Sequence, residues 1–443
     1  MEGILGRRMT VDGRPTSVIG HRSSVISRRS SVISRRSSVV IVGAGPAGMS
    51  AALFLAKKGI ASTLIEKEVF PRNKICGDGL SGWVVSMLRR IDPGLLKKLQ
   101  ELPEQLPSSG VRFFAPNMKN LALPYFSAKY PDDPPGHVIR RIDFDRLLAE
   151  EVKGKELIEL IEGVEVGSVD IHETGVILTD STGTLKFEAE MVIGACGAAS
   201  RLFRELAPRK NDNRNHATGI RQYYEGVTGV HPGNFVDFYF LEKFLPGYLW
   251  VFPLPNGKAN VGAGIRTDIL KKKRISLKQV MEEAIAVNPH LAERFANAKP
   301  ISGISAWDLP LGSKKVALSG NRFLLAGDAA SLVDPFTGEG VGNAMWSGFA
   351  AAEHIEKALA SGQFDQKFNS RYDRFVYKKL WSEMKLSTTI QNLINKPWLF
   401  KLVMNHAAGN EFLKQSVTRM IDDLEERKKL RRPWWYVRVL IGR

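Results

Sequence analysis

One pattern near the start of the chain limits the fold more than any other feature. An apolar run, SVVIVG, leads into the glycine-rich segment GAGPAG at residues 43–48, which is followed by a helix-like segment and a second apolar run that ends at Glu66. This change of periodicity from strand to helix and back predicts a βαβ unit. The chain therefore begins its folded part with the framework of a nucleotide-binding sheet.

Each part of the glycine turn has a physical role toward a dinucleotide. Gly43 permits a tight turn, Gly45 lets the backbone approach a pyrophosphate, and Gly48 lets the helix pack closely on the strand. The positive N-terminus of the helix stabilises phosphate charge, and Glu66 can accept a hydrogen bond from an adenosine ribose hydroxyl. The pattern predicts a dinucleotide site, but it does not distinguish FAD from NAD.

A second motif separates these cofactors. The short apolar strand FLLAGDAA, residues 323–330, ends in Gly-Asp, and Gly338, Gly340 and Gly342 then open a helix. A late strand followed by Gly-Asp-Ala resembles the flavoprotein segment whose aspartate binds the FAD ribityl chain, which makes Asp328 the candidate. The positive end of the following helix would face the flavin and favour its anionic reduced ring.

The remaining chain alternates sheet-like and helical blocks. Short strands are predicted within residues 157–195, aromatic-rich strands within 218–266 and an amphipathic helix at 142–153, and Pro/Ser-rich loops mark boundaries near 102–110 and 130–136. We therefore predict an α/β fold with three parts. These are a discontinuous Rossmann-type FAD-binding domain (38–100, 136–205 and 300–362), a sheet-based substrate domain (101–135 and 206–299) and a helical C-terminal region (363–443).

Charge and cysteine content narrow the function classes. Of the net charge of +17, residues 1–38 carry +6 and residues 427–443 carry +7, which leaves +4 for the rest of the chain. This distribution does not favour a nucleic-acid partner. Cys76 and Cys196 form neither a CxxC pair nor a metal-ligand cluster, so no disulfide and no metal site is expected. Without a long apolar run or a secretory signal, we expect a cytoplasmic protein.

The N-terminus repeats with a period of seven, with SSVISRR beginning at Ser23 and again at Ser30. Each copy has only two adjacent apolar residues, too few to form a core, so residues 1–37 are predicted to be a low-complexity disordered extension. A translated DNA duplication or an upstream start-site error would explain so regular a repeat. A transit peptide, rich in Arg and Ser and poor in acid, is the functional alternative.

The segment PRNKICGDGLSG, residues 71–82, resembles the PRxKxCGxG segment of the geranylgeranyl reductases, flavoproteins that saturate isoprenoid double bonds. Similar segments follow in the same order: RIDFD at 141–145, GYLWVFP at 247–253 and NVGAG at 260–264. The resemblance extends from about residue 39 to about residue 410. One departure is Cys196, which replaces the aspartate of a common Ala-Asp-Gly segment and is interpreted either as a small buried side chain or as a reactive thiol.

The resemblance implies FAD as the cofactor and assigns its contacts. Ala47 and Glu66 would hold the pyrophosphate and adenosine ends, Val164 would touch the adenine, and Arg141 would contact the FAD. Cys76 would face the flavin as a thiol, with a purely structural cysteine as the alternative. The full set of predicted cofactor-binding residues is Gly43, Gly45, Ala47, Gly48, Glu66, Cys76, Gly77, Gly79, Arg141, Val164, Asp328, Gly340 and Val341.

Tyr248, Trp250 and Phe252 alternate, so in a strand they face one side. They form either a half-buried sheet face or the wall of an apolar tunnel for a polyprenyl chain. Aromatic faces could stabilise a carbocation formed by alkene protonation by about 0.5 to 2 kcal/mol each, and flavin N5 would deliver hydride. Cys76, Tyr248 and Trp250 are the predicted catalytic residues, with Cys76, Tyr248 or water as the proton source.

The predicted activity is reduction of isoprenoid C=C bonds in a geranylgeranyl-bearing lipid, quinone or diphosphate. Because one complete dinucleotide fingerprint is present, NAD(P)H that binds transiently or a reduced small redox protein would supply the electrons. The alternatives are a flavin-dependent monooxygenase or halogenase of the same fold and a non-catalytic flavin- or lipid-binding protein. The basic and aromatic tail RKKLRRPWWYVR, residues 427–438, suits peripheral contact with the inner membrane surface, or forms a helix packed on the domain.

Overall fold

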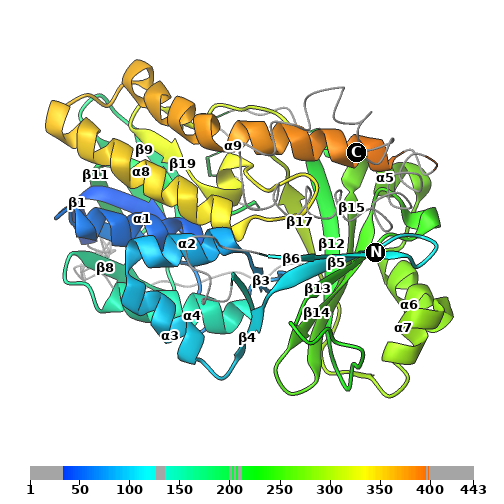
Figure 1. Ribbon diagram of the computed structural model, residues 1–443. Coiled ribbons are helices and arrows are strands. Elements are labelled where there is room, and N and C mark those ends of the chain that lie inside the picture. Colours follow the sequence, from blue (N-terminus) through cyan, green and yellow to red (C-terminus); the bar gives the residue numbers. More distant parts are fainter. Residues whose placement is uncertain are drawn as a thin grey trace, which may run out of the picture.

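The computed structural model describes residues 33–125, 135–198, 202–203, 206–207, 212–395 and 398. In this part of the chain, two eight-stranded sheets lie next to each other, and a three-stranded sheet stands between segments of both. Figure 1 shows the first sheet with its covering helices on the left and the second sheet on the right. The predicted α/β fold class is confirmed.

The first sheet is built on the predicted βαβ unit. Strand β1 (Ile33–Val42) pairs in parallel with β2 (Ser62–Ile65) and with β11 (Leu185–Gly194). Helix α1 (Pro46–Lys57) connects β1 to β2 and is buried along most of its length. The other strands of this sheet are β8 (Ile158–Ile161), β9 (Val166–Ile171), β10 (Val176–Asp180), β18 (Ser319–Gly320) and β19 (Phe323–Leu325).

Helices cover the first sheet and reach toward the second. Helix α8 (Val341–Ser361) crosses α1 so closely that a Cβ on Gly348 would lie 2.2 Å from the carbonyl oxygen of Ala47. Helix α9 (Gln366–Ile394) runs along both sheets in Figure 1, and its end packs against apolar residues of the second sheet. The remaining helices on this side are α2 (Gly82–Ile91), α3 (Pro93–Glu101) and α4 (Arg141–Lys153).

The second sheet has the order β16-β12-β15-β14-β13-β5-β6, with β17 also paired to β12. Its strands are β5 (Gly110–Phe114), β6 (Asn120–Pro124), β12 (His216–Glu225), β13 (Val236–Tyr239), β14 (Tyr248–Leu254), β15 (Lys258–Arg266), β16 (Lys299–Pro300) and β17 (Ser305–Pro310). Helices α5 (Thr267–Lys273), α6 (Leu277–Val287) and α7 (Pro289–Arg294) follow β15. The small third sheet joins β3 (Gly79–Leu80), β7 (Gly136–Ile139) and β4 (Gln105–Ser108).

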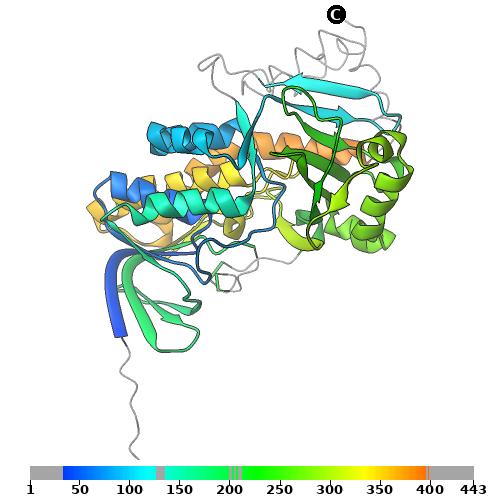
Figure 2. The ribbon, with the colours of Figure 1, turned by 90° about the horizontal axis from the view of Figure 1, so that it is seen from below.

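Two predicted boundaries are wrong. The predicted extension over residues 1–37 overlaps β1, which begins at Ile33 because residues 33–37 pair with the first half of β11. Figure 2 shows the two strands extending together beyond the helices. Residues 300–310 were assigned to the FAD-binding domain, but β16 and β17 both pair with β12 and so belong to the second sheet.

The C-terminal prediction is tested only in part. Helix α9 occupies the start of the predicted helical region at 363–443, and residues 1–32 and 399–443 lie outside the described residues, including the tail at 427–438. Within the part of the chain that is described, none of the helices has both the length and the apolarity to cross a bilayer.

Candidate active site

The glycine turn between β1 and α1 has the geometry that its sequence predicts. Gly43 has a positive φ of 100°, and a Cβ there would lie 2.6 Å from the carbonyl oxygen of Ala195. A Cβ on Gly48 would lie only 1.9 Å from the carbonyl oxygen of Gly43. Helix α1 begins after Gly45, so its free N–H groups point into the turn, as a phosphate site requires.

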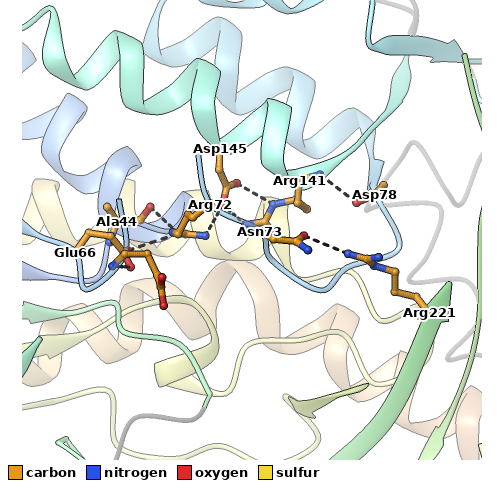
Figure 3. A network of polar contacts seen from close by, with 9 residues as sticks. Ala44, Glu66, Arg72, Asn73, Asp78, Arg141, Asp145 and Arg221 are labelled. Atoms are coloured by element: carbon orange, nitrogen blue, oxygen red, sulfur yellow. Dashed lines mark hydrogen bonds and ion pairs between the residues drawn. The ribbon is translucent and has the colours of Figure 1, made fainter. Parts of the chain in front are cut away.

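A carboxylate holds this turn at the end of β2. The backbone N–H of Ala44 donates to Glu66 Oε2 at 2.7 Å, and the Arg72 guanidinium lies 3.5 Å from the same oxygen. Arg72 also donates to the Ala44 carbonyl and to Asp145, at 3.0 Å each (Figure 3). The N–H of Val164 donates to the backbone oxygen of Glu66, so this predicted adenine contact does lie at the Glu66 end.

The late Gly-Asp segment meets the early turn. A Cβ on Gly327 would lie 3.0 Å from the Cβ of Ala47, although 280 residues of chain separate them. The Asp328 carboxylate follows directly, and a Cβ on Gly340 would be 3.8 Å from its Oδ1. Helix α8 then starts at Val341. The two halves of the predicted FAD site are therefore adjacent.

The loop at residues 76–79, CGDG, links the two sheets through a buried aspartate. Asp78 is fully buried, has a φ of 68°, and its Oδ2 accepts from the Tyr223 hydroxyl and the Asn260 amide at 2.7 Å each. Its Oδ1 accepts from the backbone N–H of Arg141 at 3.1 Å. Asn260 also donates to the Cys76 carbonyl at 2.8 Å. The loop is thus bonded to α4 and to strands β12 and β15.

The thiol of Cys76 lies beside a buried guanidinium. Arg141 is 5% exposed, and its Nε and Nη2 donate to the two carboxylate oxygens of Asp145 at 2.8 Å each. Burial raises the pKa of the Cys76 thiol, and the Arg141 charge opposes that rise. Burial also acts to lower the pKa of Arg141, but the interactions with Asp145 and with Cys76 more than offset it, so this pKa is raised. Arg141 therefore stays cationic next to Cys76.

The second sheet presents its aromatic residues to this loop. The Trp250 indole N–H donates to Asn260 Oδ1 at 2.9 Å. A Cβ on Gly77 would lie 3.2 Å from the Phe252 ring and 3.7 Å from the Trp250 indole nitrogen, and a Cβ on Gly79 would also touch Phe252. Close approach of the loop to the sheet therefore explains both glycines.

Tyr248 faces the start of α8 from the same side of β14. Its hydroxyl donates to the Thr337 carbonyl at 3.0 Å, and burial raises the pKa of this phenol. Rings contact one another around it in an aromatic cluster with centroid separations of 5.1 to 6.4 Å. The members of this cluster are Phe113, Phe238, Phe240, Tyr248, Phe252 and Phe336.

Comparison with known proteins identifies the family. The FAD binding domain model matches residues 36–374. Digeranylgeranylglycerophospholipid reductase 1 of Methanococcoides burtonii is 31% identical over 371 residues, which cover 82% of this chain and 84% of that protein. This chain belongs to the geranylgeranyl reductase family. It is an FAD-dependent oxidoreductase, as the sequence predicted.

One further curated relative and two solved structures are similar to this chain, and the two structures, at 22% and 23% identity, show the fold alone. The menaquinone reductase of Mycolicibacterium smegmatis is 29% identical over 321 residues, 71% of this chain and 75% of that one. A geranylgeranyl bacteriochlorophyll reductase-like protein of Thermoplasma acidophilum has the same fold, with a TM-score of 0.74, 23% identity and coverage of 85% and 92%. A flavin-dependent brominase shares the fold at a TM-score of 0.70, with 22% identity and coverage of 87% and 94%.

The residues of this site fit two parts of FAD. The α1 N-terminus and Arg72 provide for a diphosphate, and the Asp328 carboxylate beside Gly340 is available to ribityl hydroxyls. The contacts of the individual predicted residues with FAD stay predictions. Cys196 packs against the first core, which favours its interpretation as a small apolar side chain.

Sequence reasoning missed several polar residues of this site. Asp78 lies within the quoted CGDG segment, and its position between two glycines was a signal for a positive φ. Asn260 interrupts the apolar and small residues of ANVGAGI, where a buried polar residue needs a partner, whereas Arg221 lies in the mixed strand HATGIRQYYE and gave no such signal. Tyr223 carried no signal of its own, because its partner Asp78 is 145 residues away in sequence.

Glu66→Gln should weaken FAD binding. The amide keeps an oxygen for the Ala44 N–H, but it removes the charge that faces Arg72 and accepts ribose hydroxyls less strongly. Because hydrogen bonds to charged groups contribute about 1.5 to 3 kcal/mol, we expect a rise in the FAD dissociation constant of about tenfold or more. Fluorescence titration of the apoprotein with FAD measures this change, and an unaltered constant would remove Glu66 from the cofactor site.

Proposed function

We propose that this protein reduces isoprenoid C=C bonds of a geranylgeranyl-type lipid, quinone or diphosphate. The observation that carries the proposal is the position of the CGDG loop. It packs on the aromatic face of the second sheet, and it is bonded to the start of α4, where Arg141 binds Asp145 and Asp145 in turn binds Arg72, which donates to the glycine turn. The named activities of the relatives, on digeranylgeranylglycerophospholipid and menaquinone, belong to the same substrate chemistry.

In this proposal FAD, Cys76, Arg141 and the aromatic cluster have different roles in the reaction. Bound FAD supplies hydride chemistry at its ring. Cys76 lies where the loop would meet the edge of that ring, and its thiol interacts with Arg141, which Asp145 holds in place. The aromatic cluster offers an apolar surface for a prenyl chain and faces that can stabilise positive charge on a protonated alkene.

The polar tips of two predicted catalytic residues already have partners. The Trp250 N–H is engaged by Asn260 and the Tyr248 hydroxyl by the Thr337 carbonyl. Both rings therefore act through their faces in this proposal, by excluding water and by lining the substrate position. Proton delivery falls to Cys76 or to water held beside it.

The electron donor and the membrane contact complete the proposal. We assign the donor role to NAD(P)H that binds transiently or to a reduced small redox protein. A prenyl lipid resides in a membrane, and the basic aromatic tail at 427–438, which lies outside the described residues, is the proposed site of peripheral contact.

A flavin-dependent halogenase or monooxygenase is the second candidate. The fold shared with the brominase favours it, although at 22% identity that likeness concerns the fold alone. Such an enzyme would react with oxygen once its flavin is reduced and would give a product that contains oxygen or halogen. A reductase would give a product that differs from its substrate only by hydrogen.

An anaerobic experiment separates these functions. The FAD-loaded protein is photoreduced, mixed with geranylgeranyl diphosphate, with a geranylgeranyl glycerophospholipid or with menaquinone, and followed by flavin absorbance. We expect flavin reoxidation together with a product mass gain of two hydrogens for each bond reduced. Flavin that stays reduced with all three substrates, yet reacts with oxygen and halide to modify an added aromatic compound, would contradict the proposal.

A further inference from the structure

Three buried hydrogen-bond donors near the CGDG loop have no acceptor among the described residues. They are Lys74 Nζ, Arg221 Nε and the indole nitrogen of Trp307. Arg221 is 2% exposed, and it is one of the largest fully buried side chains. Buried donors without acceptors are costly, and a buried cation without a counterion is more so. Three such donors in one place indicate that a ligand supplies their hydrogen-bond acceptor.

The fold brings the three donors to one place. On strand β12, Arg221 pairs with Ser305 and Gly219 pairs with Trp307, so the side chains of Arg221 and Trp307 are diagonal neighbours on one face of the sheet. Arg221 donates to the Asn73 side chain at 3.2 Å, as Figure 3 shows. Lys74 follows Asn73 in sequence, and its Nζ lies 3.3 Å from the centroid of the Trp307 ring.

The acids nearby do not neutralise these cations. Asp78 is the negative neighbour of Arg221, but its two oxygens already accept from Tyr223, Asn260 and the Arg141 backbone. Lys74 feels the charge of Asp328 without a hydrogen bond to it. Burial nevertheless dominates and lowers the pKa of Lys74 to about 8. The two carboxylates thus act on these cations through their charge, but neither accepts a hydrogen bond from Lys74 Nζ or Arg221 Nε.

We propose that Lys74, Arg221 and Trp307 form a subsite for a phosphate or diphosphate ester on the substrate. The three groups are donors only, two are cationic, and an anion with several acceptor oxygens satisfies all of them. This subsite is not the one for the FAD diphosphate, because the α1 N-terminus and Arg72 lie at the Glu66 end of the network in Figure 3 and Arg221 lies at the opposite end.

The inference rests on the proposed function and makes it more specific. The named relatives act on a phospholipid or on menaquinone, and only the phospholipid carries a phosphate. A subsite of two buried cations selects a prenyl substrate with a phosphate or diphosphate head group over an uncharged prenyl quinone or alcohol. A nicotinamide dinucleotide offers the same phosphate chemistry, so the experiment must separate it from the lipid.

Calorimetric titration of the FAD-loaded protein tests the subsite. Pyrophosphate, geranylgeranyl diphosphate, geranylgeraniol and NADPH are titrated into the wild type, Lys74→Met, Arg221→Met and the control Lys272→Met, which removes an exposed charge on α5. We expect the first two variants to bind pyrophosphate and geranylgeranyl diphosphate at least tenfold more weakly, and geranylgeraniol within twofold of the wild type. Lys272→Met should match the wild type for every ligand.

The pH dependence gives a second readout. Because the pKa of Lys74 is about 8 without the anion, diphosphate binding should weaken as pH rises from 7 to 9 in the wild type and much less in Lys74→Met. Arg221→Lys should recover part of the affinity lost in Arg221→Met. If Arg221→Met does not fold, Lys74→Met and Arg221→Lys carry the test.

Three outcomes would overturn the subsite. These are an equal loss for alcohol and diphosphate, a loss for NADPH alone, or a loss of FAD affinity in Lys74→Met and Arg221→Met without any change for the diphosphates. Failure of the proposed function looks different. In that case pyrophosphate binds in a manner that depends on Lys74 and Arg221, but no prenyl compound binds or reoxidises the reduced flavin.

Discussion

Asp78→Ala is expected to lower the free energy of unfolding by about 3 to 5 kcal/mol. The change leaves the Tyr223 hydroxyl and the Arg141 N–H buried without their acceptor, at about 1 to 3 kcal/mol each before relaxation, and it leaves the Asn260 amide with the Cys76 carbonyl alone. It also places alanine at a φ of 68°, which adds about 1 kcal/mol. Urea unfolding followed by circular dichroism measures the loss.

The variant Asp78→Asn keeps the size and shape of the side chain and removes its charge, so it isolates the effect of the Asp78 charge on stability. Burial raises the pKa of Asp78, so the carboxylate binds a proton more tightly in the folded state than in the unfolded state. The stability that this proton contributes is complete below the unfolded pKa of about 3.9 and is lost as pH rises through the higher folded value. Stability of the wild type should therefore fall relative to Asp78→Asn as pH rises from about 4. Parallel profiles would show that Asp78 titrates normally.

Gly48→Ala should lower both the free energy of unfolding and the affinity of the protein for FAD. The added Cβ would lie 1.9 Å from the Gly43 carbonyl oxygen, whereas a carbon and an oxygen need about 3.3 Å. Helix α1 must therefore move away from β1, which displaces the N–H groups that face the diphosphate. We expect a cost of about 2 to 3 kcal/mol and a rise in the FAD dissociation constant of about tenfold or more.

Gly303→Ala is the matched control for this variant. A Cβ on Gly303 would have no neighbour within 4 Å, and its φ is not positive. Its unfolding free energy should stay within about 0.5 kcal/mol of the wild type, with FAD absorbance unchanged. If Gly48→Ala behaved like Gly303→Ala in both measurements, the close crossing of strand and helix would not be what holds the cofactor.

The sequence predicts most of what depends on local pattern. The βαβ unit, helix α4 and the strands β12–β15 follow from periodicity and turn residues, and the structure confirms them. The meeting of Ala47 with Gly327 was inferred only through a resemblance, because periodicity says nothing about contacts across 280 residues. The order of the flavoprotein motifs therefore predicted this long-range contact, which secondary-structure propensity does not predict.

The errors and omissions share one physical cause. Residues 33–37 look too polar for a core, but edge pairing with β11 needs backbone groups and not apolar side chains. Residues 300–310 follow a helical block, yet their strand pairs with β12, about 90 residues earlier. Asp78, Arg221 and Lys74 act through partners distant in sequence, so a single sequence without tertiary contacts does not reveal them.

The hydrogen bonds of Asn260 attach the CGDG loop to strand β15 of the second sheet. One amide group donates to the Cys76 carbonyl and to Asp78, and its oxygen holds the Trp250 indole. Cys76 is consequently held by β15 of the second sheet as well as by α4, which packs with the first sheet. If the two halves rotate during turnover, the bonds of Asn260 would carry Cys76 with the aromatic face of the second sheet, which is the proposed position of the prenyl chain, and the strained contact would be the bond from the Arg141 N–H to Asp78.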